Sequence, residues 1–245
     1  PSMAGIGLNK FKKIIPAGEG LIIMPIKNIF FDIDGVLFST AEFADIARKN
    51  ALNAMVTMGL NTSYQKLRPL LGQVIEEKGS NSRSHFDSLL EKLGVEKRIR
   101  PRLIAAAVGA YHDTKAMIQP YPEVPRILQS LREAHFGLFC ASEGIEIKQW
   151  DKLNRMHIAL LFEDVFVTTG KNTEFYLKIA KASGAKPGEC VMIGDREEKD
   201  IAPAKKAGMH TIRIRRKGSK YARGPTAADA EVTSLEGIEG ALEKI

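Results

Sequence analysis

Two aspartates, Asp32 and Asp34, lie two residues apart in an apolar run from Ile29 to Leu37, I-F-F-D-I-D-G-V-L. Side chains at this spacing point to the same side of a strand, so the two carboxylates would lie close together. Like charges at short range repel, and a bound cation, a shared proton or both relieve the repulsion. Gly35 follows directly and permits a tight exit from the strand. Taken alone, the pair could also cap a helix after the strand.

Polar residues also follow the apolar runs farther along the chain. Ser142 ends F-C-A-S, Lys171 follows V-T-T-G, and Asp195 ends V-M-I-G-D. Asp200 comes one helical turn after Asp195. Singly, these residues could be helix caps or solvated loop residues. The carboxyl ends of parallel strands meet at one edge of a sheet, so we expect all of them around one crevice with the aspartate pair.

This set of groups suits phosphoryl transfer. Asp32, Asp195 and Asp200, with Asp34 as a further candidate and a backbone carbonyl, offer the oxygen ligands that Mg²⁺ prefers. A carboxylate shielded by that cation can attack a phosphate as a nucleophile and form an aspartyl-phosphate. Asp34 would protonate the leaving alkoxide and then deprotonate the attacking water.

Two further groups would hold the phosphate. The Lys171 ammonium and the Ser142 hydroxyl can bind phosphoryl oxygens as charge spreads over them. Backbone N–H groups at the turn formed by Gly35 would add donors.

Strands and helices alternate in the part of the chain that must position these groups. The pattern predicts a parallel α/β sheet covered by helices on both faces. The expected strands are residues 26–33, 136–140, 165–168, 190–193 and 210–214, and the expected helices are residues 124–134, 144–156, 172–183 and 199–207.

The segment between the first strand and Pro120-Tyr121-Pro122 has a helical pattern throughout. Its expected helices are residues 41–58, 62–78, 83–93 and 96–117, with Thr62 and Ser63 as candidate N-caps. We therefore expect an α/β core domain formed by residues 21–40 and 120–245, a helical cap domain at residues 41–119, and an N-terminal extension at residues 1–20.

The composition of the 245 residues, 44% hydrophobic and 27% charged, is typical of a globular protein. No apolar stretch is long enough to span a bilayer, and residues 1–20 lack the continuous apolar core of a secretory signal, so we expect a cytoplasmic protein without a membrane partner. Cys140 and Cys190 end apolar runs and are expected to be buried, reduced thiols.

The net charge of +7 raises the question of a nucleic-acid partner. The basic residues cluster between Arg213 and Arg223, with one aromatic residue, Tyr221, where a single-strand binder offers several stacking platforms. We therefore expect a solvated loop here and no nucleic-acid site.

Four segments, in order, resemble the motifs of the haloacid dehalogenase superfamily of hydrolases: F-D-I-D-G-V-L, C-A-S, G-K-N-T-E-F-Y and I-G-D-R-E-E-K-D. The resemblance covers nearly the whole chain after residue 25. It implies a Rossmann-like core, an obligate Mg²⁺ and a nucleophilic Asp32. The helical insert resembles the C1-type cap of subfamily I, the group of phosphoglycolate phosphatase-like enzymes, and such caps open and close over the site.

Two positions depart from the family pattern. Glu143-Gly144 stands where many relatives have Asn-Gly. A carboxylate there would repel phosphate, so we expect Glu143 either to point elsewhere or to contact a polar part of the substrate. The third motif lacks the usual prolines after Lys171, which leaves Lys148 and Lys152 as weaker candidates for its lysine.

The expected function is hydrolysis of a small phosphorylated metabolite. A dehalogenase would not need Asp34, because halide leaves without a proton. A phosphonate-cleaving enzyme would need a Schiff-base lysine in the cap, where Lys49, Lys66 and Lys78 read as helix-face residues. A phosphomutase, which uses the same nucleophile and acid/base, stays an alternative, and a nucleic-acid-binding protein on an inactive scaffold is a remote one.

Overall fold

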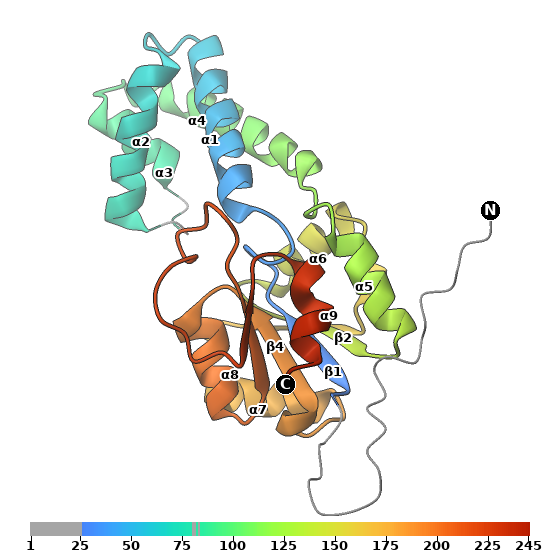
Figure 1. Cartoon of the computed structure of the whole chain (residues 1–245). Helices are drawn as coiled ribbons and strands as arrows, with labels where there is room; N and C mark the ends of the chain where they lie inside the picture. Colours follow the sequence, from blue (N-terminus) through green and yellow to red (C-terminus); the bar gives the residue numbers. More distant parts are fainter. Residues whose placement is uncertain (1–25, 80–81, 83) are drawn as a thin grey trace, which may run out of the picture. The chain divides into compact units, whose positions relative to one another are not determined.

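The structure is a computed structural model that describes residues 26–79, 82 and 84–245. The chain divides into two compact units: Thr40–Ile118 forms one, and the segments on either side of it form the other. The predicted extension at residues 1–20 lies outside the described residues. Each unit is described by itself below, with the element labels of Figure 1.

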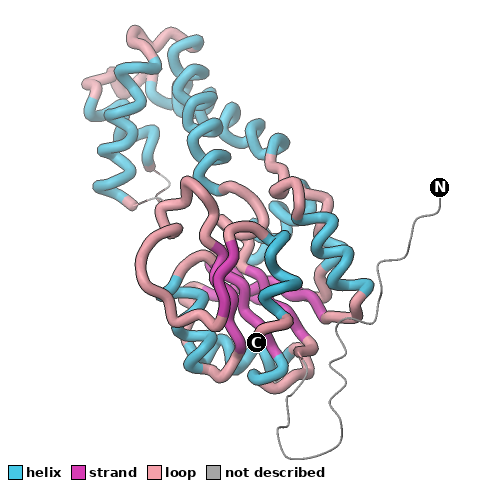
Figure 2. Tube along the Cα trace, in the orientation of Figure 1, coloured by secondary structure: helices cyan, strands magenta, loops and turns pink. Residues whose placement is uncertain are grey.

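The sheet-containing unit holds a six-stranded parallel sheet with the order β3-β2-β1-β4-β5-β6, shown in magenta in Figure 2. This confirms the predicted parallel α/β architecture. The last strand, β6, was not expected from the sequence. The strands are β1 (Asn28–Phe31), β2 (Gly137–Glu143), β3 (Asp164–Thr168), β4 (Cys190–Gly194), β5 (His210–Ile214) and β6 (Ala230–Val232).

Strand β1 lies in the middle of the sheet, and all four of its residues are buried. Phe30 pairs in register with Phe139 of β2 and Met192 of β4, and these three side chains belong to one hydrophobic cluster. Ile29 and Phe31 point to the opposite face by the two-residue alternation of a strand. A strand buried on both faces reads as a continuous apolar run, as this one does.

Helices cover both faces of the sheet. Two of them, α7 (Thr173–Ala182) and α8 (Ala202–Lys206), contribute to the cluster around Phe30. In Figure 1, α5 (Val124–Glu133) and α9 (Ile238–Leu242) lie on the other side of the sheet. Helix α6 (Glu146–Arg155) joins β2 to β3. The segment before α8 is a π-helical turn, Glu197–Ile201, where we expected the start of an ordinary helix.

The helical unit consists of four α-helices and a 3₁₀ turn among its described residues. These are α1 (Thr40–Thr57), α2 (Tyr64–Lys78), α3 (His85–Lys92), α4 (Arg100–Asp113) and the turn Thr114–Met117. All four helices contribute to one apolar core, as Leu52, Leu67, Leu89 and Leu103 illustrate. Ser63 occupies the N-cap position of α2, but its side chain makes no capping hydrogen bond.

The chain leaves the sheet-containing unit and returns to it at adjacent points. The Tyr121 N–H donates to the Leu37 carbonyl over 2.9 Å, joining the outgoing segment to the returning one. Arg216 fastens the same junction: it donates to the Val36 carbonyl over 2.8 Å and pairs with Glu123 at 2.6 Å. Its guanidinium also lies 3.6 Å from the centre of the Tyr121 ring.

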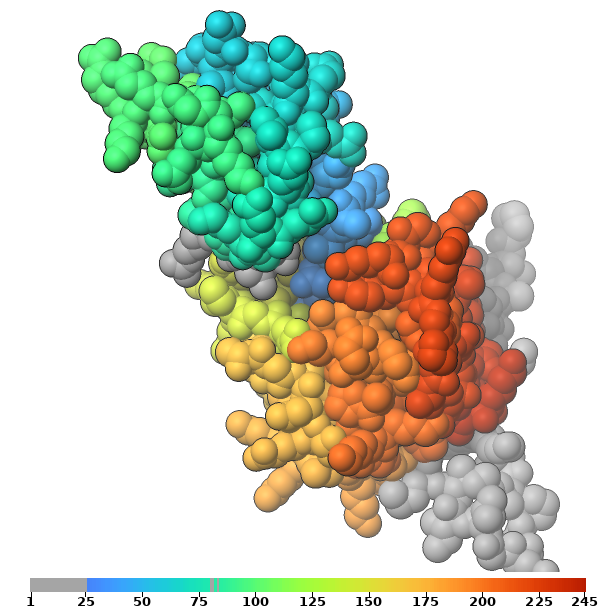
Figure 3. All heavy atoms as spheres, turned by 90° about the vertical axis from the view of Figure 1, so that its left-hand side faces the viewer, coloured from blue at the N-terminus to red at the C-terminus, as the bar shows by residue number. Residues whose placement is uncertain are grey.

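The basic cluster that begins in β5 is only in part the solvated loop that we expected: Lys217, Lys220 and Arg223 are exposed, but Arg213, Arg215 and Arg216 are not. Arg213 is only 3% exposed, because its guanidinium donates to the carbonyls of Tyr221 and Pro225 and pairs with Glu197. Arg215 likewise pairs with Glu231. A guanidinium offers five donors, which lets it satisfy the carbonyls of a loop that has no ladder of its own. Figure 3 shows this loop as the orange-red surface of the sheet-containing unit.

Two further expectations concern the cysteines and the membrane. Cys140 and Cys190 are free and buried, as predicted. Within the described part of the chain, no helix combines the length and the apolar character that crossing a bilayer requires.

Candidate active site

Three buried aspartates lie together at the carboxyl ends of the two central strands. Asp32 follows β1 directly, Asp195 follows β4, and Asp200 lies in the π-helical turn. Each offers a carboxylate oxygen within 4.8 Å of the others. The strand order therefore brings together three residues that are up to 168 positions apart in the sequence.

The π-helical turn delivers Asp200 to this group. The Arg196 N–H donates to Asp200 Oδ2 over 3.0 Å and ties the carboxylate to the start of the turn. Gly194 leaves room for the approach, because a Cβ on this residue would collide with the Asp200 side chain. Single π turns within helices are frequent at functional sites.

Gly35 forms the tight exit from the strand that we expected, but its N–H is already used within the chain. Its N–H donates to the Phe38 carbonyl over 3.1 Å, so this donor closes a turn and is not presented to a phosphate. Glycine is required here for two other reasons: its φ is +82°, and a Cβ would lie 2.5 Å from Asp195 Oδ2.

Lys171 is the cation of the cluster. Its Nζ lies 2.9 Å from Asp32 Oδ1 and 2.5 Å from Asp200 Oδ1, and its side chain is fully buried. Asn172 takes the place of the missing prolines: its side chain accepts the Phe175 N–H over 2.8 Å and so caps α7. Burial alone would lower the pKa of Lys171, but Asp200 and Asp32 raise it above its ordinary value, so the ammonium persists.

The carboxylates are harder to ionise than ordinary aspartates. Burial, opposed by Lys171 and reinforced by Asp200 and Asp34, raises the pKa of Asp32 to about 6. Burial, with the charges of Asp200 and Asp32, raises the pKa of Asp195 to about 7. Both shifts reflect burial first, and then the negative charge of the neighbouring carboxylates, which the nearby cations do not fully offset.

The cluster fits a divalent cation. Three ionised carboxylates and one ammonium leave two uncompensated negative charges in a buried place. Asp195 Oδ1 is buried and has no hydrogen-bond partner among the described residues, so it offers lone pairs that nothing else uses. Carboxylate oxygens are the donors that Mg²⁺ prefers.

Ser142 also has an unused polar atom. It lies in β2 beside the central strand, and its buried hydroxyl finds no partner within the described part of the chain. The alternative of a helix cap does not apply, since the N-cap position of α6 is Ile145. A buried hydroxyl in this state is suited to a ligand oxygen.

Asp34 is not a member of the acidic cluster. Its carboxylate instead receives Lys152 Nζ at 2.7 Å and 2.8 Å, one contact to each oxygen. Lys152 comes from α6 and also lies 5.6 Å from the centre of the Phe38 ring. Asp34 still lies near enough to Asp32 to raise its pKa, while Lys171 and Lys152 pair with different aspartates.

Glu143 faces cations of its own chain. Its carboxylate accepts the Lys171 N–H at 3.0 Å and pairs with Arg196 at 3.0 Å and Lys199 at 2.9 Å. Both carboxylate oxygens are thus engaged within the chain, which favours the first of the two alternatives, in which Glu143 points elsewhere. No signal in the sequence pointed to these partners, because Arg196 falls between the expected strand and helix and Lys199 is the first residue of the expected helix.

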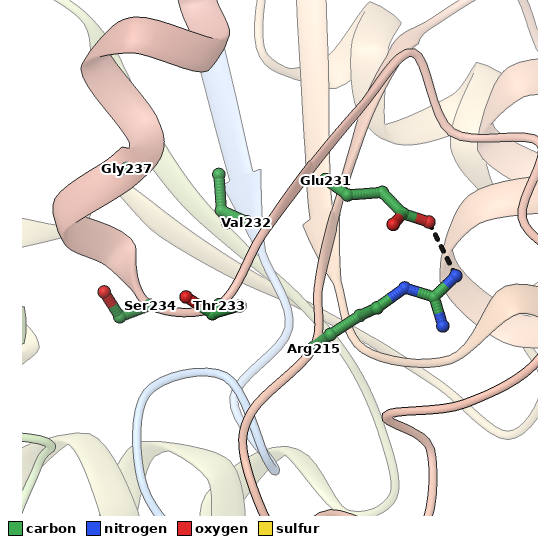
Figure 4. A pocket seen from close by; sticks show the side chains of 6 residues that line it. All are labelled: Arg215, Glu231, Val232, Thr233, Ser234 and Gly237. Carbon is green, nitrogen blue, oxygen red and sulfur yellow. Dashed lines mark hydrogen bonds and ion pairs between the residues drawn. The ribbon is translucent and has the colours of Figure 1, made fainter.

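A separate pocket of about 430 Å³ lies beside the sheet edge at β6 (Figure 4). Arg215 and Glu231 line it and pair with each other at 2.6 Å, and Thr233 and Ser234 lie nearby. None of the residues around it is one of the strand-end residues, so it adds nothing to the aspartate cluster.

Curated relatives resemble the chain over most of its length. A glyceraldehyde 3-phosphate phosphatase of Methanopyrus kandleri is 41% identical over 219 residues, which cover 86% of this chain and 92% of the relative. The enzyme of the same name from Methanocaldococcus jannaschii is 36% identical over 86% of this chain and 94% of its own. A phosphoglycolate phosphatase of Aquifex aeolicus is 25% identical over 75% of this chain and 82% of its own.

Solved structures share the fold. A phosphatase of the haloacid dehalogenase type from Thermococcus onnurineus superposes with a TM-score of 0.63 at 21% identity, covering 89% of this chain and 99% of that one. A 2-haloacid dehalogenase from Pseudomonas syringae gives a TM-score of 0.64 at 21% identity, covering 89% and 98%. The family model for haloacid dehalogenase-like hydrolases matches residues 26–208. This match confirms the resemblance carried by the four motifs: the chain belongs to the haloacid dehalogenase-like hydrolase family.

Proposed function

We propose that this protein hydrolyses glyceraldehyde 3-phosphate in a Mg²⁺-dependent reaction that passes through a phosphorylated Asp32. Curated relatives that are 41% and 36% identical over most of both chains are phosphatases, which makes this protein a phosphatase of small phosphate monoesters. The observation that carries the mechanism is the buried Asp32 carboxylate, flanked by Lys171 and by two further carboxylates at the sheet edge.

In the first half-reaction, an Asp32 oxygen attacks phosphorus and the bond from phosphorus to the substrate oxygen breaks. Mg²⁺, held by Asp32, Asp195 and Asp200, would offset the negative charge of these groups and of the phosphate. Lys171 and the Ser142 hydroxyl would bind phosphoryl oxygens.

Asp34 moves the protons. In its protonated form it gives one to the leaving alkoxide, and it then takes one from the water that attacks the phosphorylated Asp32, which releases phosphate, restores the Asp32 carboxylate and leaves Asp34 protonated as at the start. Its position outside the three-carboxylate cluster supports this division of labour, because an acid/base group must be able to exchange protons with substrate and water.

The helical unit would act as a C1-type cap that selects the substrate. It is inserted directly after the first motif, and all of its described elements are helices or turns. The names of the five relatives with the highest identities point to glyceraldehyde 3-phosphate, and a sixth relative points to phosphoglycolate. Both are small monoesters, which is the class of partner expected from the sequence.

A substrate panel tests the proposal. Glyceraldehyde 3-phosphate, phosphoglycolate, glucose 1-phosphate and a nucleoside monophosphate are incubated with enzyme and Mg²⁺, and both free phosphate and the organic product are measured. Glyceraldehyde 3-phosphate loses phosphate spontaneously, so the formation of glyceraldehyde, and not phosphate alone, is the readout. We expect its kcat/KM to exceed that of each other ester by at least about tenfold.

The Asp32→Asn variant is the matched control, since it keeps the side-chain shape and removes the nucleophile. We expect its turnover to fall by at least about 10³-fold with the fold intact. Glyceraldehyde formation by this variant at the wild-type rate would refute the mechanism. Conversion of glucose 1-phosphate to an isomer without release of phosphate would instead identify a phosphomutase.

A further inference from the structure

Glu143 lies at a junction of three strand-end segments. It is the last residue of β2, directly after Ser142, and it pairs in register with Thr168 of β3. Its own carbonyl accepts Gln149 Nε2 over 2.7 Å, which fixes the backbone at the exit of the strand. The residue is thereby anchored at both its strand and its loop side.

The carboxylate binds donors from two other segments. Oε1 accepts both the Lys171 N–H at 3.0 Å and Lys199 Nζ at 2.9 Å, while Oε2 accepts Arg196 Nη2 at 3.0 Å. Both oxygens are therefore engaged within the chain, and the contact to Lys171 is to its backbone, not to its ammonium.

Each of these donors is adjacent to a residue of the aspartate cluster. Lys171 carries the ammonium itself, Arg196 follows Asp195, and Lys199 precedes Asp200. The Arg196 N–H also donates to Asp200 Oδ2, and the Lys199 carbonyl accepts the buried Tyr176 hydroxyl over 3.0 Å. Glu143 thus connects the segments that hold every charged member of the cluster except Asp32.

The charge of Glu143 suits this contact. Burial would raise its pKa, but the hydrogen bonds from the Lys171 N–H, Lys199 and Arg196 outweigh burial and lower the pKa to about 2. The carboxylate is therefore ionised at neutral pH. A neutral side chain could not balance two cations in this place.

We infer that Glu143 is a positioning residue, whose carboxylate holds the Lys171 segment and the turn from Arg196 to Asp200 in register with Ser142. This role rests on the proposed function. Catalytic groups act at their full rate only when they are held within a fraction of an ångström of the productive geometry. A residue that fixes the segments of Lys171, Asp195 and Asp200 should therefore affect the chemical step more than substrate binding.

The test compares Glu143→Gln with Glu189→Gln. Glu189 is a matched control at the opposite end of β4: it too accepts a backbone N–H, from Lys186 at 2.8 Å, and an ammonium, from Lys27 at 2.7 Å. The measurements are kcat and KM with p-nitrophenyl phosphate, the Mg²⁺ concentration for half-maximal activity, and Tm with and without Mg²⁺.

For Glu143→Gln we expect kcat to fall about 10- to 100-fold while KM changes less than about threefold. The Mg²⁺ concentration for half-maximal activity should rise about tenfold, and the increase of Tm on addition of Mg²⁺ should shrink. Glu189→Gln should lower the Mg²⁺-free Tm to a similar extent but leave kcat and the Mg²⁺ dependence at wild-type values.

Wild-type kcat and Mg²⁺ dependence in Glu143→Gln would overturn the inference, and so would an equal loss of kcat in both variants. If Glu143→Gln does not fold, Lys199→Met decides, because this lysine is more exposed: we expect a loss of kcat of about 3- to 10-fold, and an unchanged kcat refutes the inference. A wild-type protein without turnover would refute the proposed function instead.

Discussion

The substitution Asp195→Asn should make the metal-free protein more stable while it removes metal binding. Raising the pKa of this buried carboxyl from 3.8 to about 7 makes the ionised form unfavourable in the folded state. Each pKa unit corresponds to about 1.4 kcal/mol, so the full penalty is about 4 kcal/mol. Burial is the largest cause of this penalty and the charges of Asp200 and Asp32 add to it, so we expect the substitution by a neutral side chain to recover about 2–4 kcal/mol.

The stability difference between Asp195→Asn and the wild type should depend on pH. Between pH 4 and 7 the folded protein holds a proton on Asp195 that the unfolded chain has lost, so wild-type stability falls as the pH rises through this window. Asparagine has no such proton, and it forfeits no bond at the position of Asp195 Oδ1, which has no partner among the described residues. The variant's gain in free energy of unfolding over the wild type should be near zero at pH 4 and reach its plateau above pH 7.

Urea unfolding in excess chelator, at several pH values from 4 to 8.5, measures this difference. Asp229→Asn is the control, for which we expect the opposite change in stability. The contacts of Asp229 with Lys205 and Thr211 outweigh its partial burial and lower its pKa. Replacing Asp229 should therefore destabilise the protein above pH 4. With saturating Mg²⁺ only the wild type should gain stability. A variant less stable than the wild type at pH 8 in chelator would show that Asp195 is not under electrostatic strain.

Two further predictions concern the same cluster. Gly35→Ala should lower the free energy of unfolding, measured in urea, by about 1–3 kcal/mol more than Gly184→Ala does. Both glycines have positive φ, but only at Gly35 would the new Cβ meet Asp195. Equal losses of stability in the two variants would contradict this close approach. The Mg²⁺ concentration for half-maximal activity should rise at least about tenfold when the pH falls from 7.5 to 5.5. The pKa of Asp195 is about 7 and that of Asp32 about 6, and both carboxyl groups must lose their protons to bind the cation. A Mg²⁺ dependence that does not change with pH would contradict this prediction.

The sequence was sufficient to place the strand-end residues because their positions follow from strand order alone. An apolar run that ends in Asp32 and another that ends in Asp195 must meet at one edge if the strands are parallel neighbours, and they do. Strand β6 has only three residues, none of them fully buried, and so lacks the apolar run that marks the other strands.

Contacts between side chains on separate loops were beyond sequence reasoning. Nothing in the pattern of α6 distinguishes Lys152 from its neighbours, although it reaches Asp34 across 118 positions. The buried Arg213 was misjudged for the same reason: a run of basic residues reads as solvated unless the carbonyls that it will satisfy are known. Whether the Gly35 N–H is free to bind a ligand likewise depends on its hydrogen bond to the Phe38 carbonyl, which residue types alone do not reveal.

The junction at Leu37 and Tyr121 has an evolutionary consequence. Because the outgoing and returning segments are hydrogen-bonded to each other and fastened by Arg216, the sheet-containing unit is closed at this point whatever is inserted beyond it. Insertions whose ends lie side by side can be lengthened, exchanged or lost at little cost to the host fold. If the helical unit selects the substrate, as proposed, natural selection could therefore change which phosphate ester the protein accepts by replacing one module, without altering the aspartate cluster of the sheet-containing unit.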